Sequence, residues 1–284
     1  MKHLQKPKIS TKDVVIDCAG AYREGTHGGL KAKLISAADI IHQESLSYDF
    51  AMQNGDYSCF TTHKIVNGNI AANDMCDTYD NKFVSVSRIR SKYYDKLMAT
   101  ATTGKCPICG IGQVANLDHY LAKSLYPMYA LTPVNLTPIC RDCNYEKRDV
   151  VISSDCAPLH PFYDDVDSLE WLCADISLSD DSLVATYYVN AELSDSNPML
   201  YERLVEHLKL FNLPKAYAIQ AASEISENEH LWKTQYERWG KEVFCEYLND
   251  CLVSREKMQR NTWYTALMRA LIKHITQIIQ KDCF

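Results

Sequence analysis

Two closely spaced cysteine pairs, and the polar residues between them, have the most evident chemistry in this sequence. Two residues separate the cysteines of each pair, so two thiolates can reach one ion from a short turn. The pairs are Cys106 with Cys109 and Cys140 with Cys143. Four thiolates complete a closed tetrahedral site, which is typical of structural zinc. Because a closed site has no open position for catalysis, the intervening polar residues need a separate explanation.

Those polar residues are an Asp-His dipeptide and two asparagines. They are Asp118, His119, Asn135 and Asn144, and the last of them directly follows the second cysteine pair. His119 is the only one whose side chain titrates near neutral pH, which makes it the natural general base. Successive side chains of a strand point to opposite faces. We therefore expect a bulge or bend in the strand that brings Asp118 and His119 to one site. Otherwise a metal ion bound there must lie to one side of the strand.

The elements that must position these residues are predicted in the order strand, loop, strand, helix. Residues 114–121 and 136–139 suit two short strands, with Pro127 and Pro133 keeping the segment between them as a loop. Residues 141–148 suit a helix that begins near the second cysteine pair. A further helix is predicted over 84–101, where apolar residues recur every four positions.

The flanks of this segment differ in pattern. Residues 1–83 are mixed, with a helix expected from about 30 to 41 and a loop-rich stretch from 58 to 82. Beyond 165, a hairpin is predicted over 171–189, followed by helices, one of which begins at Pro198. The predicted fold class is α+β, with an N-terminal docking region (1–83), a core (84–165) and a mostly helical C-terminal region (166–284).

Composition and charge narrow the possible classes of protein. The net charge of −6 does not indicate a general nucleic-acid binder, but residues 84–150 contain nine Lys or Arg against five Asp or Glu, a local balance of +4. No apolar stretch is long enough to predict a membrane span, and we expect no secretory signal. The eight scattered cysteines favour a reducing cytoplasm over a disulfide framework. The sequence has no P-loop, so any nucleotide hydrolysis would require another chain.

Asp118-His119, Asn135 and Asn144, set between two such cysteine pairs, resemble the HNH endonucleases with their ββα-metal core. The resemblance implies that Asp118 and a helical Asn144 hold a catalytic Mg²⁺ or Mn²⁺, and that Asn135 orients His119 or its loop. Asn144 stands where many members have histidine, and an amide oxygen can also bind a hard cation. The resemblance further implies phosphodiester hydrolysis that leaves a 5′-phosphate and a 3′-hydroxyl.

Three further residues are candidates for contact with substrate phosphate. Lys147 and Arg148 follow Asn144 by three and four positions, which places them on one helical face. His160 begins a polar and aromatic cluster just beyond the core, although a buried structural histidine is the simpler interpretation.

The strings 118–124, 138–144, 160–164 and 261–264 are similar to those of HNH subunits from bacterial anti-phage systems of the Septu type, including retron-associated ones. This resemblance implies a DNA-cleaving effector that acts with a separate partner ATPase. Two alternatives remain open. One is an HNH ribonuclease, for example one acting on transfer RNA, because nothing in the motif reads the 2′-hydroxyl. The other is a non-catalytic zinc module that binds nucleic acid or protein.

Overall fold

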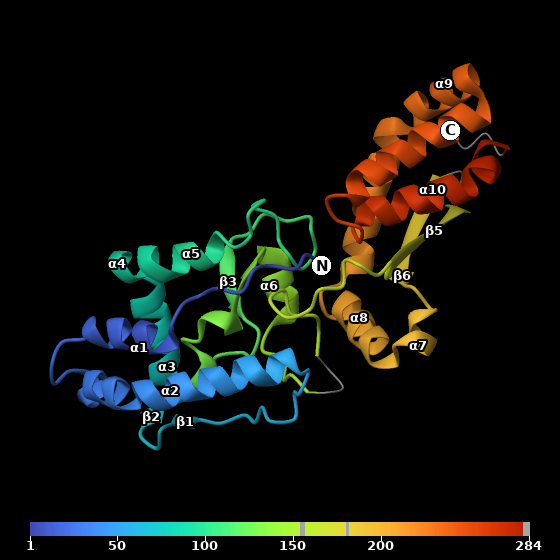
Figure 1. Ribbon diagram of the computed structural model, residues 1–284. Coiled ribbons are helices and arrows are strands. Elements are labelled where there is room, and N and C mark those ends of the chain that lie inside the picture. Colours follow the sequence, from blue (N-terminus) through green and yellow to red (C-terminus); the bar gives the residue numbers. More distant parts are fainter. Residues whose placement is uncertain (154–156, 180–181, 281–284) are drawn as a thin grey trace. The chain divides into compact units, whose positions relative to one another are not determined.

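A computed structural model describes residues 1–153, 157–179 and 182–280 of this α+β protein. The chain divides into two compact units, which are described separately: an N-terminal unit, His3–Asp165, and a C-terminal unit, Val166–Phe284 with Met1–Lys2. The boundary predicted between residues 83 and 84 falls inside the N-terminal unit. Among the described residues there are three two-stranded sheets, and Figure 1 shows how the helices and strands follow one another along the chain.

The N-terminal unit begins with two helices that lie against each other, α1 (Thr11–Gly20) and α2 (Leu30–Gln53). Both contribute to one apolar core that also contains Phe83, Leu97 and Leu117. Residues on either side of position 83 are thus buried together. This shared core explains why the predicted docking region is not a separate body: its apolar side chains are covered by the segment that follows it.

The middle of this unit is more helical than the sequence predicts. A short hairpin is followed by a series of short helical segments, two of which, η2 and η3, are π-helical turns. Their bounds are β1 (Ile65–Val66), β2 (Ile70–Ala71), α3 (Ala72–Thr78), η2 (Tyr79–Val84), α4 (Ser87–Ile89), η3 (Arg90–Tyr94) and α5 (Asp95–Met98). The loop-rich prediction for 58–82 is wrong over α3 and η2, and the single regular helix predicted for 84–101 is divided. Tyr79 and Phe83 are buried and stacked, so tertiary packing of aromatic rings outweighs the local turn signals here.

The strand, loop, strand and helix order is present around the cysteine pairs. Strand β3 (Asn116–His119) pairs antiparallel with β4 (Leu136–Ile139), and α6 (Arg141–Lys147) follows at once. The loop between the strands contains two 3₁₀ turns, η4 (Pro127–Tyr129) and η5 (Pro133–Asn135), each beginning at a proline. Strand β3 is shorter than the predicted 114–121, because the register runs only from Asn116 to His119.

Over its described residues, the C-terminal unit consists of one hairpin and four helices. The hairpin pairs β5 with β6, and parts of α8, α9 and α10 pack on it. The bounds are β5 (Leu172–Ser179), β6 (Ser182–Val189), α7 (Leu193–Ser196), α8 (Pro198–Leu210), α9 (Leu213–Glu256) and α10 (Trp263–Gln280). The predicted helix start at Pro198 is confirmed, with the Asn197 side chain accepting a hydrogen bond from the Leu200 amide. Helix α9 is interrupted at Gly240, whose φ is 76°. Glycine adopts a positive φ readily because it has no Cβ atom.

None of the helices in the described ranges combines the length and apolar character that crossing a bilayer requires.

Candidate metal centre and adjoining pocket

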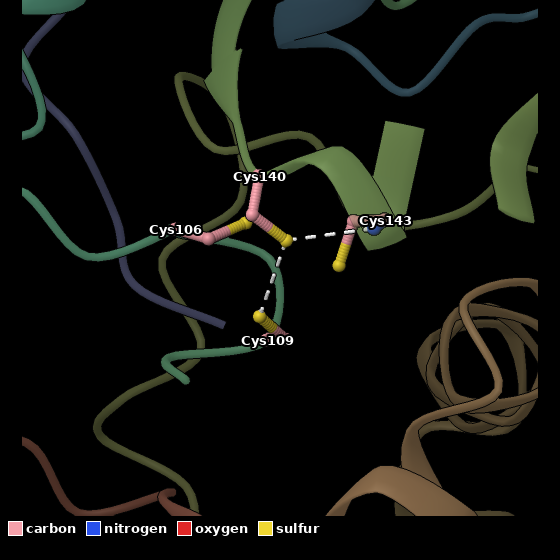
Figure 2. A group of neighbouring side chains, drawn as sticks. All are labelled: Cys106, Cys109, Cys140 and Cys143. Atoms are coloured by element: carbon pink, nitrogen blue, oxygen red, sulfur yellow. Dashed lines mark hydrogen bonds between the residues drawn. The ribbon is translucent and has the colours of Figure 1, made fainter. Parts of the chain in front are cut away.

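The two cysteine pairs come together in the N-terminal unit as one cluster. The four sulfur atoms of Cys106, Cys109, Cys140 and Cys143 all lie within 4.8 Å of one another, and Figure 2 shows them converging from a turn, the end of β4 and the first turn of α6. The Cys109 and Cys140 sulfurs are 3.8 Å apart. Tetrahedral zinc with Zn–S bonds of about 2.3 Å needs sulfur separations of about 3.8 Å. The donor set and its spacing therefore fit a zinc ion.

Backbone amides around the cluster are aimed at the sulfurs. Cys109 accepts from the amides of Ile111 and Gly112, and Cys140 accepts from that of Cys143, each at 3.4 Å. Such donors stabilise thiolate charge. Hydrogen bonds offered by the other three thiols also lower the pKa of Cys109, beginning with that of Cys106. The surroundings thus favour the thiolate form of Cys109 and Cys140, which is the form that binds metal, whereas the neighbouring thiols raise the pKa values of Cys106 and Cys143.

Gly112 is required where the first turn meets the second cysteine pair. A Cβ atom at this position would lie 2.7 Å from the Cβ of Cys140 and 2.9 Å from its sulfur. Any side chain here would therefore force the backbone or the Cys140 side chain to shift.

A pocket of about 400 Å³ opens in the same unit, and three of the four predicted catalytic residues line it. These are Asp118 and His119 from β3 and Asn144 from α6. The pairing of β3 with β4 is regular through Asp118 and His119, without the expected bulge. Asn116 and Leu117 also line the pocket, so four consecutive strand residues face it. Consecutive residues can do so when the pocket runs along the unpaired edge of the strand rather than over one face.

His119 is buried and held in a defined orientation. Its Nε2 lies 2.9 Å from the carbonyl oxygen of Ala130, and its ring packs edge-on against Tyr79, with centroids 4.4 Å apart. A carbonyl only accepts hydrogen bonds, so Nε2 carries the proton and Nδ1 is the basic nitrogen. Burial lowers the pKa of His119 to about 3. The imidazole is consequently neutral at any ordinary working pH.

Asn135 lies outside the pocket but closes the loop that follows His119. Its Oδ1 accepts from the amide of Leu121 at 2.8 Å, and its Nδ2 donates to the carbonyls of Leu121 and Tyr129 at 3.1 Å. Asn135 is fully buried. Among the described residues, no hydrogen bond joins Asn135 to the imidazole itself, but Asn135 fixes the same loop whose Ala130 carbonyl accepts from His119.

The three predicted phosphate contacts take different positions. Arg148 is exposed and lines the pocket, with a positive φ of 49° that is uncommon for a side chain of its size. Lys147 is 2% exposed and binds Asp118 and the end of β3 instead, so it has little surface to offer a phosphate. His160 is fully buried, with Nδ1 accepting from the Phe162 amide and Nε2 beside the Tyr48 hydroxyl. His160 is therefore a structural histidine, and its prediction as a phosphate contact is wrong.

The charge at Asp118 is partly compensated inside the protein. Burial raises the pKa of Asp118 above its ordinary value, while the ammonium of Lys147 acts in the opposite direction. Lys147 is 2.9 Å from Oδ2 of Asp118. A hard cation entering the pocket would meet the carboxylate of Asp118 and the amide oxygen of Asn144, which are the ligand types that Mg²⁺ and Mn²⁺ prefer.

Sequence reasoning did not anticipate several residues of the pocket wall. They are Tyr79, Asp80, Val84, Tyr94, Ala122, Lys123 and Asp149. Tyr79 and Asp80 lie in the segment predicted to be loop-rich, and no local pattern connects them with a histidine 40 positions later. Lys123 could have been predicted from the sequence, because it belongs to the string that follows the Asp-His dipeptide. In the structure it forms an ion pair with Asp80 and lies over the ring of Tyr79.

The fold and the cluster together define an α+β protein with a four-cysteine centre able to hold zinc. In sequence, 171 residues are 30% identical to Protein Ea31 of Escherichia phage lambda, covering 57% of this chain and 56% of that relative. The chain thus matches little more than half the length of Ea31, whose name states no activity. No protein-family model matches the sequence, and no solved structure matches the fold.

Proposed function

We propose that this chain is a metal-dependent HNH nuclease that hydrolyses phosphodiester bonds. The observation that carries the proposal is the shared pocket: Asp118, His119 and Asn144 line one cavity of about 400 Å³ in the unit that contains the four-cysteine cluster. In this interpretation β3, β4 and α6 form a ββα-metal core, and zinc supports it without taking part in the reaction.

The residues divide the chemistry among them. Nδ1 of His119 accepts a proton from water as the water oxygen attacks phosphorus, and the bond from phosphorus to the 3′ oxygen breaks. A divalent ion held by Asp118 and Asn144 would stabilise charge on the phosphate and on the leaving oxygen. A base with a pKa of about 3 is neutral but weak. An anionic phosphate beside it raises that pKa, because a negative neighbour favours the imidazolium.

The pocket also provides cationic groups for the substrate. Arg148 and Lys123 line it, and both lie in the segment whose local charge is positive. Phosphate contacts of this kind supply much of the affinity of nucleic-acid-binding proteins. We further propose that DNA is the substrate and that a partner ATPase of an anti-phage system controls cleavage. The resemblance of the motif strings supports this extension, and the net charge of −6 is consistent with a need for a partner.

The decisive test compares the zinc-loaded wild type with His119→Ala on plasmid DNA and on total RNA, with Mg²⁺ or Mn²⁺. The comparison is made with and without the proteins that copurify with the chain. We expect the wild type to cut DNA and His119→Ala to lose at least about 100-fold in rate. His230→Ala, an exposed histidine in the C-terminal unit, is the matched control and should retain activity.

The other outcomes identify the alternatives. Cleavage of RNA alone, lost in His119→Ala, would indicate the ribonuclease. Cleavage that His119→Ala leaves unchanged, or no cleavage under any of these conditions, would favour a non-catalytic zinc module. Asp118→Ala and Asn144→Ala should also abolish cleavage while circular dichroism shows a folded protein.

A further inference from the structure

A lysine is buried directly behind the candidate catalytic residues. Lys147, at the end of α6, is 2% exposed. Its Nζ lies 2.9 Å from Oδ2 of Asp118 and donates to the carbonyl oxygen of His119 at 2.6 Å. Lysine is almost never fully buried unless its charge is paired. A single ammonium group thus connects helix α6 to both residues at the end of β3.

The neighbouring cation is placed quite differently. Arg148 is exposed and lines the pocket, whereas Lys147 is not among the pocket-lining residues. Of these two adjacent basic residues, Lys147 therefore lies in the interior and Arg148 lies at the pocket. Arg148 can meet a phosphate that enters, whereas the ammonium group of Lys147 contacts Oδ2 of Asp118 and the carbonyl oxygen of His119.

We propose that Lys147 is a positioning residue, the fixed internal counter-ion of Asp118, which occupies Oδ2 and leaves the other carboxylate oxygen for a divalent cation. This inference rests on the proposed function, because the cation is the one proposed for the nuclease. It assigns Lys147 no contact with substrate. An ammonium group beside the carboxylate also repels an incoming cation, so Lys147 weakens metal binding while it holds the ligand in place.

The first test measures Mn²⁺ binding to the zinc-loaded protein, without nucleic acid, by calorimetry or by electron paramagnetic resonance. Lys147→Met keeps an unbranched side chain that lacks only the terminal ammonium position, and it removes the charge. We expect it to bind Mn²⁺ at least about tenfold more tightly than the wild type does, because the repulsion is gone. An unchanged or weaker affinity, or no Mn²⁺ binding by either protein, would overturn the proposal.

The second test separates positioning from substrate contact. Affinity for a short DNA or RNA duplex is measured by fluorescence anisotropy at several salt concentrations without divalent ions, with Arg148→Gln as the matched comparison. Lys147→Met should keep the wild-type affinity and salt dependence. Arg148→Gln should bind more weakly, with a salt slope smaller by about one phosphate contact. A reduced slope in Lys147→Met would show that Lys147 meets phosphate and would refute its assignment as an internal counter-ion.

The third test applies if Lys147→Met folds poorly. Removing the lysine leaves Asp118 buried without its partner, and Asp118→Asn removes that unpaired charge. The double variant Asp118→Asn/Lys147→Met should therefore melt at a higher temperature than Lys147→Met. A double variant that melts no higher would contradict the counter-ion role.

The failure of the proposed function can be told apart from the failure of this inference. Asp118→Asn alone should abolish the Mn²⁺ binding seen in the wild type. If Mn²⁺ still binds to Asp118→Asn, this inference fails too, because Asp118 is then not the ligand that Lys147 positions. If Asp118→Asn abolishes Mn²⁺ binding but the wild type never cleaves nucleic acid, only the nuclease assignment fails.

Discussion

The Nε2 of His119 lies 2.9 Å from the carbonyl oxygen of Ala130, eleven residues further along the chain. This contact selects the tautomer of the imidazole, since the carbonyl can only accept. It also explains why the loop between β3 and β4 matters: the loop that Asn135 closes is the one that orients the proposed base.

Acidification should destabilise the protein through His119. Its pKa is about 3 in the folded state and about 6.5 when unfolded, so the unfolded state binds the extra proton as pH falls below 6.5. Between pH 7 and pH 5 the wild type should lose about 2 kcal/mol more unfolding free energy than His119→Gln. Denaturant titrations of both proteins at the two pH values measure this. Equal losses would show that the imidazole is not buried as a neutral group.

Replacing Asn135 should loosen the loop after His119. Asn135→Ala leaves the backbone amide and carbonyl of Leu121 without their partners, whereas the Tyr129 carbonyl still accepts from the Thr132 amide at 3.2 Å. We expect a loss of about 3 kcal/mol. The exposed Asn249 provides the control, and Asn249→Ala should stay within about 0.5 kcal/mol of the wild type. Chemical denaturation monitored by circular dichroism compares the three proteins. Similar losses for both variants would exclude a special role for the Asn135 contacts.

Gly112→Ala should weaken metal binding by the four-cysteine cluster. The added methyl group would lie 2.7 Å from the Cβ of Cys140, so backbone or sulfur must shift, which typically costs about 1–3 kcal/mol. Gly20→Ala is the matched control, because a Cβ there meets nothing within 4 Å. Competition with a zinc chelator ranks the two variants. Zinc retention equal to the wild type in Gly112→Ala would mean that the cluster can adjust to the extra atom.

Loss of zinc should unfold the N-terminal unit. Structural zinc contributes about 10–16 kcal/mol of apparent binding free energy, which is comparable to or larger than the stability of a typical domain. Cys109→Ser, or chelation of the wild type, is expected to release about one zinc ion per chain and to abolish the cooperative melt of this unit. The exposed Cys59 is the control, and Cys59→Ser should change neither zinc content nor melting. A folded, metal-free Cys109→Ser protein would contradict a structural role for the ion.

Local spacing determined a large part of the candidate site. Two residues between the cysteines of each pair restrict the thiolates to one short turn, so the four-sulfur cluster could be predicted before any fold was known. The strands and helix around it could be placed for the same reason, because prolines and the cysteines themselves mark their ends. The C-terminal hairpin and the helix from Pro198 also followed from local pattern.

Only the tertiary structure decided what surrounds those residues. Tyr79 packs on His119 from a π-helical turn 40 positions earlier, and nothing in the sequence near either residue indicates that contact. Lys147 and Arg148 are adjacent cations that sequence reasoning treated alike. Lys147 is buried through its contacts with Asp118 and with the His119 carbonyl, whereas the positive φ of Arg148 ends the helix and its side chain lines the pocket. The sequence specifies which groups can do chemistry through their types and spacing, whereas burial and pairing depend on elements that meet only when the chain folds.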